Sequence, residues 1–189
     1  MPPRCKNPDA PRDGDPGYLH YVETHFGGGA VLLANDPTGI SEVVNDIDLE
    51  LTNFWRVLQK PEAFALLKRR LEATPCSEWE YDHACQHPPP DGIDVECAAA
   101  FFVRNRQSRQ ALGKCFATLT KKRTRRSMGE LPAAWLSAIE GLPEIHVRLQ
   151  RIVILCDDAF NVISQQDGPR TLYYIDPTYL HSTRAVENA

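Results

Sequence analysis

The sequence contains no hydrophobic run of about 18 residues, the length that a membrane-spanning helix needs. Residues 1–8 also lack the apolar core of a secretory signal peptide. The six cysteines are scattered along the chain and include no C-x-x-C pair, which argues against a disulfide framework. We therefore expect a cytoplasmic protein with reduced thiols and no membrane partner.

Metal ligands at a recognised spacing are lacking as well. His83 and His87 flank Cys85, but no further ligands follow at the spacing typical of zinc sites. We therefore expect no metal centre.

The composition that remains is that of a globular protein. With 189 residues, of which 42% are apolar and 24% are charged, the chain is long enough for one domain with a substantial core. Residues 1–17 hold five prolines and no periodic apolar pattern. We therefore expect an irregular leader over 1–17, followed by a domain over 18–189.

Strand-like and helix-like segments alternate along the chain. Short apolar runs rich in β-formers predict strands over 18–22, 40–46, 151–156 and 171–175. Apolar residues at helical spacing predict helices over 29–34, 48–59, 62–72, 95–107, 131–139, 143–149 and 159–166, whereas 73–94 predicts a loop with three consecutive prolines. This alternation is typical of an α/β fold with a parallel sheet and helices on both faces.

Three consecutive glycines, Gly27, Gly28 and Gly29, separate the first predicted strand from the first predicted helix. Glycine allows positive φ and lets a ligand come close to the main chain. The amides at the start of the following helix then face that ligand. The pattern predicts a ligand-binding turn, although many protein classes use such turns.

Acidic residues follow the other predicted strands. Asp46 comes about 20 positions after the glycines, where a carboxylate of a nucleotide-binding α/β unit accepts hydrogen bonds from ribose hydroxyls. The alternative is that Asp46 caps the next helix, a role that Asp48 could also fill. Asp157, Asp158 and Asp176 follow the last two strands. Because ligands bind beyond the carboxyl ends of parallel strands, we expect these groups to converge on one site.

A basic tract extends from residue 104 to residue 126, with nine Lys and Arg residues and no Asp or Glu. The rest of the chain holds 12 basic and 25 acidic residues. A cationic segment on an acidic body is typical of nucleic-acid binding, and the interleaved Ser and Thr residues can bind phosphate; the alternative is a solvated basic loop. The basic residues are Arg104, Arg106, Arg109, Lys114, Lys121, Lys122, Arg123, Arg125 and Arg126.

Three motifs occur in a fixed order: Y-V-E-x-x-F-G-G-G-A-V at 21–31, E-V-V-N-D-I-D-x-E-L-x-N-F-W-R-V-L at 42–58, and Y-Y-I-D-P-T-Y-L at 173–180. Together they resemble the adenine-N6 DNA methyltransferases of the DNA adenine methylase type. Residues 101–108 are similar to phage and prophage members of that family. The resemblance extends from about residue 18 to the C-terminus, and the order of the motifs makes it specific.

The resemblance implies a Rossmann-like S-adenosylmethionine-dependent methyltransferase fold with an inserted, mainly helical target-recognition region at about 75–150. It implies methyl transfer from S-adenosylmethionine to the N6 amine of adenine in double-stranded DNA, and we expect a monomer. The implied cofactor-binding residues are Phe26, Gly27, Gly28, Gly29, Asp46, Ile47, Asp158 and Asp176. The implied catalytic residues are Asp176, Pro177 and Tyr179, and the implied DNA contacts are the nine basic residues named above.

The chain departs from the family pattern at several points. Thr24 and His25 stand between Glu23 and Phe26, where the family has E-P-F, and Thr178 replaces a proline of D-P-P-Y. The family's first segment, with its Lys and glycines, has no counterpart in 1–17, and the chain ends ten residues after Tyr179. We therefore expect a chain truncated at both ends. The alternatives are a remnant that binds cofactor or DNA without turnover, and a nucleotide-cofactor oxidoreductase that uses only the glycine turn and Asp46.

Overall fold

The structure of the protein is a computed structural model that describes residues 17–109, 113–117 and 122–177. Its centre is a four-stranded parallel sheet in the order β5-β2-β1-β6. The strands are β1 (His20–Glu23), β2 (Ser41–Asn45), β5 (Ile152–Leu155) and β6 (Thr171–Tyr174). The predicted strands and the parallel α/β arrangement are thus confirmed. The leader predicted over 1–17 lies almost wholly outside the described residues.

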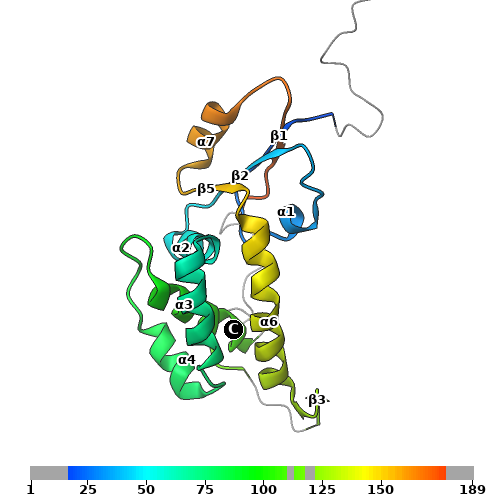
Figure 1. Cartoon of the computed structure of the whole chain (residues 1–189). Coiled ribbons are helices and arrows are strands. Elements are labelled where there is room, and N and C mark those ends of the chain that lie inside the picture. The colour runs from blue at the N-terminus through cyan, green and yellow to red at the C-terminus, as the bar shows by residue number, and fades with distance from the viewer. Residues whose placement is uncertain (1–16, 110–112, 118–121, 178–189) are drawn as a thin grey trace, which may run out of the picture.

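Helices connect the strands and cover the sheet (Figure 1). They are α1 (Ala30–Ala34), α2 (Leu49–Gln59), α3 (Pro61–Glu72), α4 (Glu78–Cys85), α5 (Val95–Arg106), α6 (Glu130–Leu149) and α7 (Ala159–Gln166). Five of them, α2 to α6, lie between β2 and β5 in the sequence and form one helical layer. None of the helices in the described part of the chain is long and apolar enough to cross a membrane.

The two faces of the sheet are covered differently. Val22 lies between Val43 and Tyr173 in the strand register, and this row packs against Val162 of α7. The opposite face contributes Val44 to the larger core, which also contains the buried residues of α2, α3, α5 and α6. The residues of that core that are completely inaccessible include Leu32, Leu58, Leu67, Leu71 and Leu149.

Two predictions about the helical layer were wrong. Residues 73–94 are not all loop, because Ser77 caps α4 by accepting a hydrogen bond from Glu80 N at 3.1 Å, and the helix ends before the prolines. Residues 131–149 are not two helices, because Pro143 lies inside α6. A proline removes one backbone donor, but the buried stripe of α6 continues on both sides of it, from Trp135 to Leu149.

A small antiparallel hairpin was not predicted at all. It pairs β3 (Thr124–Arg125) with β4 (Met128–Gly129), and its turn residues Arg126 and Ser127 both have positive φ. Such φ values are those of a two-residue hairpin turn, which usually contains Asn or Gly. The absence of those residues explains why the sequence pattern did not reveal the turn.

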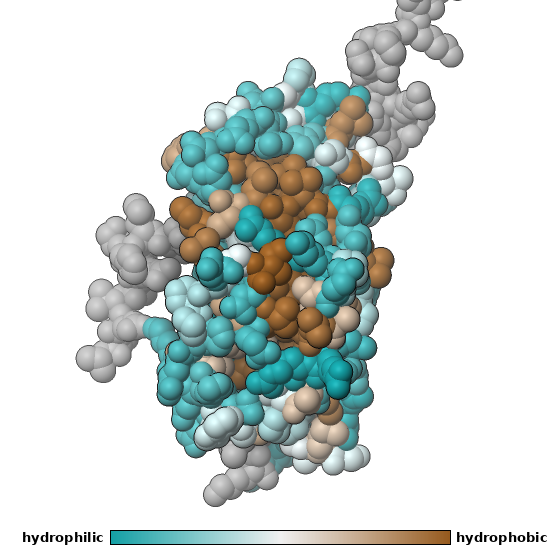
Figure 2. Space-filling model, turned by 60° about the vertical axis from the view of Figure 1, so that its left-hand side comes forward, coloured by the Kyte–Doolittle hydropathy of each residue, from teal (hydrophilic) through white to brown (hydrophobic). Residues whose placement is uncertain are grey.

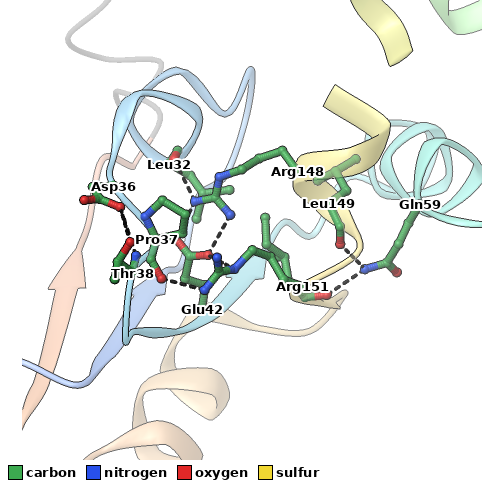
Figure 3. Close-up of polar contacts among 10 residues, drawn as sticks. Leu32, Asp36, Pro37, Thr38, Glu42, Gln59, Arg148, Leu149 and Arg151 are labelled. Atoms are coloured by element: carbon green, nitrogen blue, oxygen red, sulfur yellow. Dashed lines mark hydrogen bonds and ion pairs between the residues drawn. The ribbon is translucent and has the colours of Figure 1, made fainter. Parts of the chain in front are cut away.

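An ion-pair cluster lies at the start of β2 (Figure 3). The Glu42 carboxylate is buried and accepts hydrogen bonds from Arg148 at the end of α6, with an Nη1–Oε2 distance of 2.6 Å. Arg148 also donates to the carbonyl of Leu32 in α1 at 3.1 Å, and Arg151 approaches Glu42 to 3.7 Å. Gln59 joins α2 to the same corner by donating to the carbonyls of Leu149 and Ile152. The cluster therefore fixes α1, α2 and α6 at the amino-terminal edge of the sheet.

Candidate active site at the carboxyl edge of the sheet

The strand order reverses at the opposite, carboxyl-terminal edge of the sheet. From β1 the chain adds β2 and then β5 on one side, and β6 pairs with β1 on the other side. Ligands of open α/β sheets bind at such a reversal of strand order, outside the carboxyl ends of the strands. The β5 arrow points to the left in Figure 1, and Figure 2 brings that side forward. The middle of the face that Figure 2 shows is apolar, and hydrophilic surface surrounds it.

The glycine loop follows β1 and is held by β2. Phe26 N donates to the carbonyl of Asn45 at 2.9 Å, and Gly27 N donates to Asp46 Oδ2 at 2.9 Å. Gly29 has a φ of 68°, and a Cβ at this position would lie 2.7 Å from the Phe26 ring, so only glycine fits there. Gly28 is exposed, and a Cβ on it would meet no atom within 4 Å. The protein's own packing therefore leaves the space beside Gly28 open.

Asp46 lies between the glycine loop and α2. Its Oδ1 accepts from Asp48 N at 3.0 Å, while its Oδ2 accepts from Gly27 N. Asp48, and not Asp46, caps α2 by accepting from Glu50 N at 2.9 Å and Leu51 N at 3.1 Å. Each carboxylate oxygen has two acceptor positions, so Asp46 keeps capacity for hydroxyl donors. Asp46 is half-buried, and the next residue, Ile47, is 70% exposed.

Asn45 was missed by the sequence analysis. Its side chain is buried and donates to the carbonyls of Thr24 at 3.1 Å and Asp157 at 3.0 Å. Its Oδ1 accepts from Asp157 N at 2.9 Å. One amide side chain thus joins the ends of β1, β2 and β5.

The end of β5 carries the two aspartates at the start of α7. Asp158 caps α7 by accepting from Phe160 N at 2.8 Å, and Asp157 accepts from Asn161 Nδ2 at 3.1 Å. The side chain of Phe160 is 80% exposed. A large aromatic group on this edge was not predicted as a site residue.

Glu23, at the end of β1, is a second missed residue. It is buried, and this burial raises its pKa from 4.5 to about 6, although it accepts a hydrogen bond from the Tyr21 hydroxyl at 3.0 Å. The nearby Asp176 carboxylate adds to the rise in the pKa of Glu23. Asp176 and Pro177 follow β6 and are exposed, whereas Tyr179 lies outside the described residues. The structure therefore brings Glu23 and Asp176 close together.

The carboxylates of this edge share one electrostatic property. Within residues 17–109, 113–117 and 122–177, no Lys, Arg or His forms an ion pair with Glu23, Asp46, Asp157, Asp158 or Asp176. Their hydrogen-bond donors are backbone amides and neutral side chains. Around the glycine loop, this edge therefore carries carboxylates that have no cationic partner among the described residues.

The basic tract is divided between inward and outward positions. Arg104 pairs with Glu50 at 2.7 Å and donates to the carbonyl of Ala84, and its side chain is only 15% exposed. The guanidinium of Arg106 lies 5.6 Å from the centre of the Phe102 ring. In the sequence, Arg109 and Lys114 come after α5 and before the hairpin. Lys121 is outside the described residues. The geometry thus gives Arg104 a structural contact inside the helical layer.

The hairpin carries the remaining cations. Arg126 forms a two-point contact with Glu140 at 2.9 and 3.0 Å, and Arg123 approaches Glu130 to 3.9 Å. Lys122 and Arg125 are exposed, and no acidic residue of the described segments pairs with them. Lys122, just before the hairpin, and Arg125, on β3, are therefore open to a polyanion.

A hollow of about 610 Å³ lies between the glycine loop and the helical layer. Gly27 and Gly28 line one side. Residues of α1, α2, α5 and α6 line the rest: Leu33, Leu51, Phe54, Trp55, Phe101, Phe102, Asn105, Arg106, Leu142 and Ile145. We call it the aromatic hollow. It could not be predicted, because its walls come from segments that are far apart in the sequence.

The described residues contain no group of three or more His, Cys, Asp or Glu side chains that could hold a metal ion. His83, which the sequence places near Cys85 and His87, stacks on Trp79 with a centroid distance of 5.4 Å. This contact gives His83 a packing role.

A protein-family model matches most of the chain. The family description "D12 class N6 adenine-specific DNA methyltransferase" matches residues 9–187. A search of curated proteins found no match.

Proposed function

Because the chain belongs to the D12 class N6 adenine-specific DNA methyltransferase family, which matches it over residues 9–187, we propose that it methylates the N6 amine of adenine at specific sites in double-stranded DNA. Members of this family depend on S-adenosylmethionine. The observation that carries the proposal is the convergence of the glycine loop, Asp46 and Asp176 at the carboxyl edge of the sheet.

The cofactor side of the site consists of the glycine loop and the end of β2. S-adenosylmethionine supplies a methyl group on a positively charged sulfur when it is bound. The open space beside Gly28 suits a ligand that approaches the main chain, and Asp46 accepts hydrogen bonds from the ribose hydroxyls. The uncompensated carboxylates favour a cationic ligand at this edge.

Apolar side chains flank the position of the cofactor adenine. Ile47 and Phe160 are 70% and 80% exposed, on the loops after β2 and β5, and each presents a flat or broad apolar surface. Asp158 keeps one carboxylate oxygen beyond the one that caps α7, and that oxygen accepts a hydrogen bond from the adenine amine.

The target side consists of Asp176, Pro177 and Tyr179. The lone pair of the adenine amine is delocalised into the ring, so the amine is a weak nucleophile. The Asp176 carboxylate and the Pro177 carbonyl accept hydrogen bonds from this NH₂ group and favour the pyramidal nitrogen that attacks the methyl group. Tyr179 stacks on the extruded base, a contact worth about 1–3 kcal/mol in single-strand binders.

The basic tract contacts the DNA backbone through two outward cations, Lys122 just before the hairpin and Arg125 on it. Lys122 and Arg125 are exposed and free of acidic partners within the described segments, so they can pair with phosphates. On binding, each cation that neutralises a phosphate releases roughly one counterion, so the logarithm of the DNA affinity falls as the logarithm of the salt concentration rises. Replacing both residues with Gln should make this fall less steep by about 2. An unchanged slope in a filter-binding titration would reject the hairpin as a phosphate contact.

Methyl transfer from labelled S-adenosylmethionine to unmethylated DNA tests the proposal. We expect transfer by the unchanged chain and a fall in kcat of at least about 100-fold in Asp176→Asn, because the substitution removes the charge that faces the developing positive nitrogen. Asp167→Asn, an exposed acidic residue before β6, is the matched control and keeps its activity.

The outcomes separate the competing functions. Binding of S-adenosylmethionine or DNA without any transfer identifies a remnant without turnover. Thermal stabilisation by NAD, together with none by S-adenosylmethionine, contradicts the proposed cofactor and favours an oxidoreductase.

A further inference from the structure

We propose that Cys85 and Cys115 form a redox-active thiol pair, which hydrogen peroxide converts to a disulfide. The inference goes beyond the proposed methyl transfer and does not depend on it. It assigns a reversible modification to two cysteines that are distant in the sequence and that both lie beside Tyr81.

Exposure separates these two cysteines from the others. Among the cysteines of the described segments, Cys85 and Cys115 are exposed, whereas Cys97 is buried. Cys76 and Cys156 are only partly exposed. Burial raises the pKa of Cys76 and that of Cys97 to about 11. Because the thiolate is the form that reacts, these two buried thiols stay unreactive at neutral pH, and the exposed pair is open to a dissolved oxidant.

Helix α4 places Cys85 beside Tyr81. Residues four apart on a helix lie on the same face, and Cys85 is the last residue of α4. Burial, the hydrogen bond with the Cys85 thiol and the neighbouring Cys115 raise the pKa of Tyr81 to about 12. Arg104 donates to the carbonyl of Ala84 at 2.9 Å, which holds this end of α4 against α5. The Cys85 thiol is thereby fixed next to the Tyr81 hydroxyl.

The chain after α5 brings Cys115 to the same tyrosine. The Tyr81 hydroxyl donates to the carbonyl of Gly113 at 2.9 Å, and its ring centre lies 5.9 Å from that of Phe116. Cys115 stands between these two contact residues in the sequence. The carbonyl of Cys115 accepts from Arg109 N at 2.9 Å, which pairs it with the chain just beyond α5. Contacts on both sides of Cys115 therefore hold it near α4.

The oxidation is balanced by two thiols and one peroxide. One thiol, as its thiolate, attacks a peroxide oxygen, the O–O bond breaks, and a sulfenic acid and one water result. The second thiol attacks the sulfenic sulfur, so that an S–S bond forms, the S–O bond breaks and a second water leaves. The two thiols lose two electrons and two protons in total, and the peroxide takes up both. A dithiol reductant reverses the reaction by thiol–disulfide exchange.

The disulfide would fasten the basic tract to the helical layer. Cys115 lies within the tract, which covers 104–126, and Cys85 belongs to α4. In the reduced protein, hydrogen bonds of Tyr81 and Arg109 hold this part of the tract. In the oxidised protein, a covalent bond holds it as well. The redox state of the pair thus sets how firmly the middle of the tract is attached.

Peroxide treatment of the reduced full chain, followed by alkylation of the remaining thiols and mass spectrometry, tests the inference. Digestion with trypsin and Glu-C places Cys85 on peptide 81–96, Cys115 on peptide 115–121, and every other cysteine on a peptide of its own. We expect these two peptides to be recovered as one linked pair, lighter than their sum by two hydrogen atoms. Dithiothreitol should separate them again.

Serine variants show whether the pair is specific. Cys85→Ser and Cys115→Ser should each lose the linked pair completely. Both residues are exposed, so both variants should fold. Cys156→Ser is the matched control, because Cys156 lies after β5 at the sheet, and it should keep the linked pair.

Two results would overturn the inference. In the first, peptides 81–96 and 115–121 are recovered separately after peroxide treatment, each alkylated or singly oxidised. In the second, the bridge joins two chains. A mixture of unlabelled and ¹⁵N-labelled protein detects this case, because linked pairs that contain one peptide of each kind then appear.

Discussion

The two ends of strand β2 carry carboxylates in opposite settings. At the amino end, Glu42 is buried and two arginines approach it, Arg148 at 2.6 Å and Arg151 at 3.7 Å. At the carboxyl end, Asp46 is only half-buried, and its two known partners are the amides of Gly27 and Asp48. Only Val43, Val44 and Asn45 therefore separate a carboxylate that is paired with arginines from one that has no cationic partner among the described residues.

The different surroundings of the two carboxylates assign a structural role to Glu42 and a ligand-binding role to Asp46. Burying an unpaired carboxylate lowers the free energy of unfolding by several kcal/mol. The folded state, in which Glu42 is buried, therefore depends on the pair with Arg148. Asp46 is half-exposed and has two backbone donors, so it needs no cationic partner and remains available to a ligand. Changes at the two ends should therefore affect different quantities: the free energy of unfolding at Glu42, and ligand affinity at Asp46.

The largest expected effect is at the amino end. Arg148→Met leaves Glu42 buried with only the more distant Arg151, and it removes the hydrogen bond to Leu32. We expect a loss of about 3 kcal/mol in the free energy of unfolding, measured by urea denaturation. The matched control is Arg151→Met, whose side chain is 44% exposed, and which should cost no more than about 1 kcal/mol. Equal costs for the two variants would contradict the structural role of the Arg148 pair.

An intermediate effect is expected at the carboxyl end. Asp46→Asn removes the charge and one of the acceptor oxygens but keeps the shape, so we expect S-adenosylmethionine to bind about tenfold more weakly, at a small cost in stability. Calorimetric titration measures the affinity. Asp48→Asn is the control, because Asn caps helices as well as Asp does, and its affinity should not change. A large loss of stability in Asp46→Asn without a loss of affinity would show that this end, too, is structural.

The sequence predicted the elements that depend on local patterns. Helix α2 has an apolar stripe with Phe54 and Leu58 on it, and it begins at an acidic cap, so both its existence and its start could be predicted. Helix α4 was missed because it is short and weakly amphipathic, with charged residues around only two buried side chains, Tyr81 and Ala84. Helix α6 was divided because Pro143 normally ends a helix, whereas here the packing of Leu142 and Leu149 on both sides of it maintains the helix.

The site was predictable to the extent that its residues follow strands. Asp46 and the glycine loop were found in this way, and the hydrogen bond between Gly27 and Asp46 brings them together. Asn45 was not found, because its partner Asp157 is 112 residues away in the sequence. Phe101 and Phe102 meet the glycine loop only when α5 packs beside it. Tertiary contacts of this kind leave no local pattern.

The smallest expected effect concerns Glu23, the one buried carboxylate at the site edge. Its pKa in the folded protein is about 6 and lies above the unfolded value of 4.5, so between these values the folded state holds more protons than the unfolded state. Stability from this group is therefore greatest below pH 4.5 and falls as the pH rises to 6, by about 1–2 kcal/mol.

Glu23→Gln removes that titration and keeps an acceptor for the Tyr21 hydroxyl. The variant should thus be more stable than the unchanged chain by about 1 kcal/mol at pH 8, and the difference should vanish near pH 4.5. Urea denaturation at the two pH values measures it. A difference that is the same at both values would mean that Glu23 is neutral at both, or that its charge is compensated as that of Glu42 is, and the carboxyl edge would then resemble the amino edge.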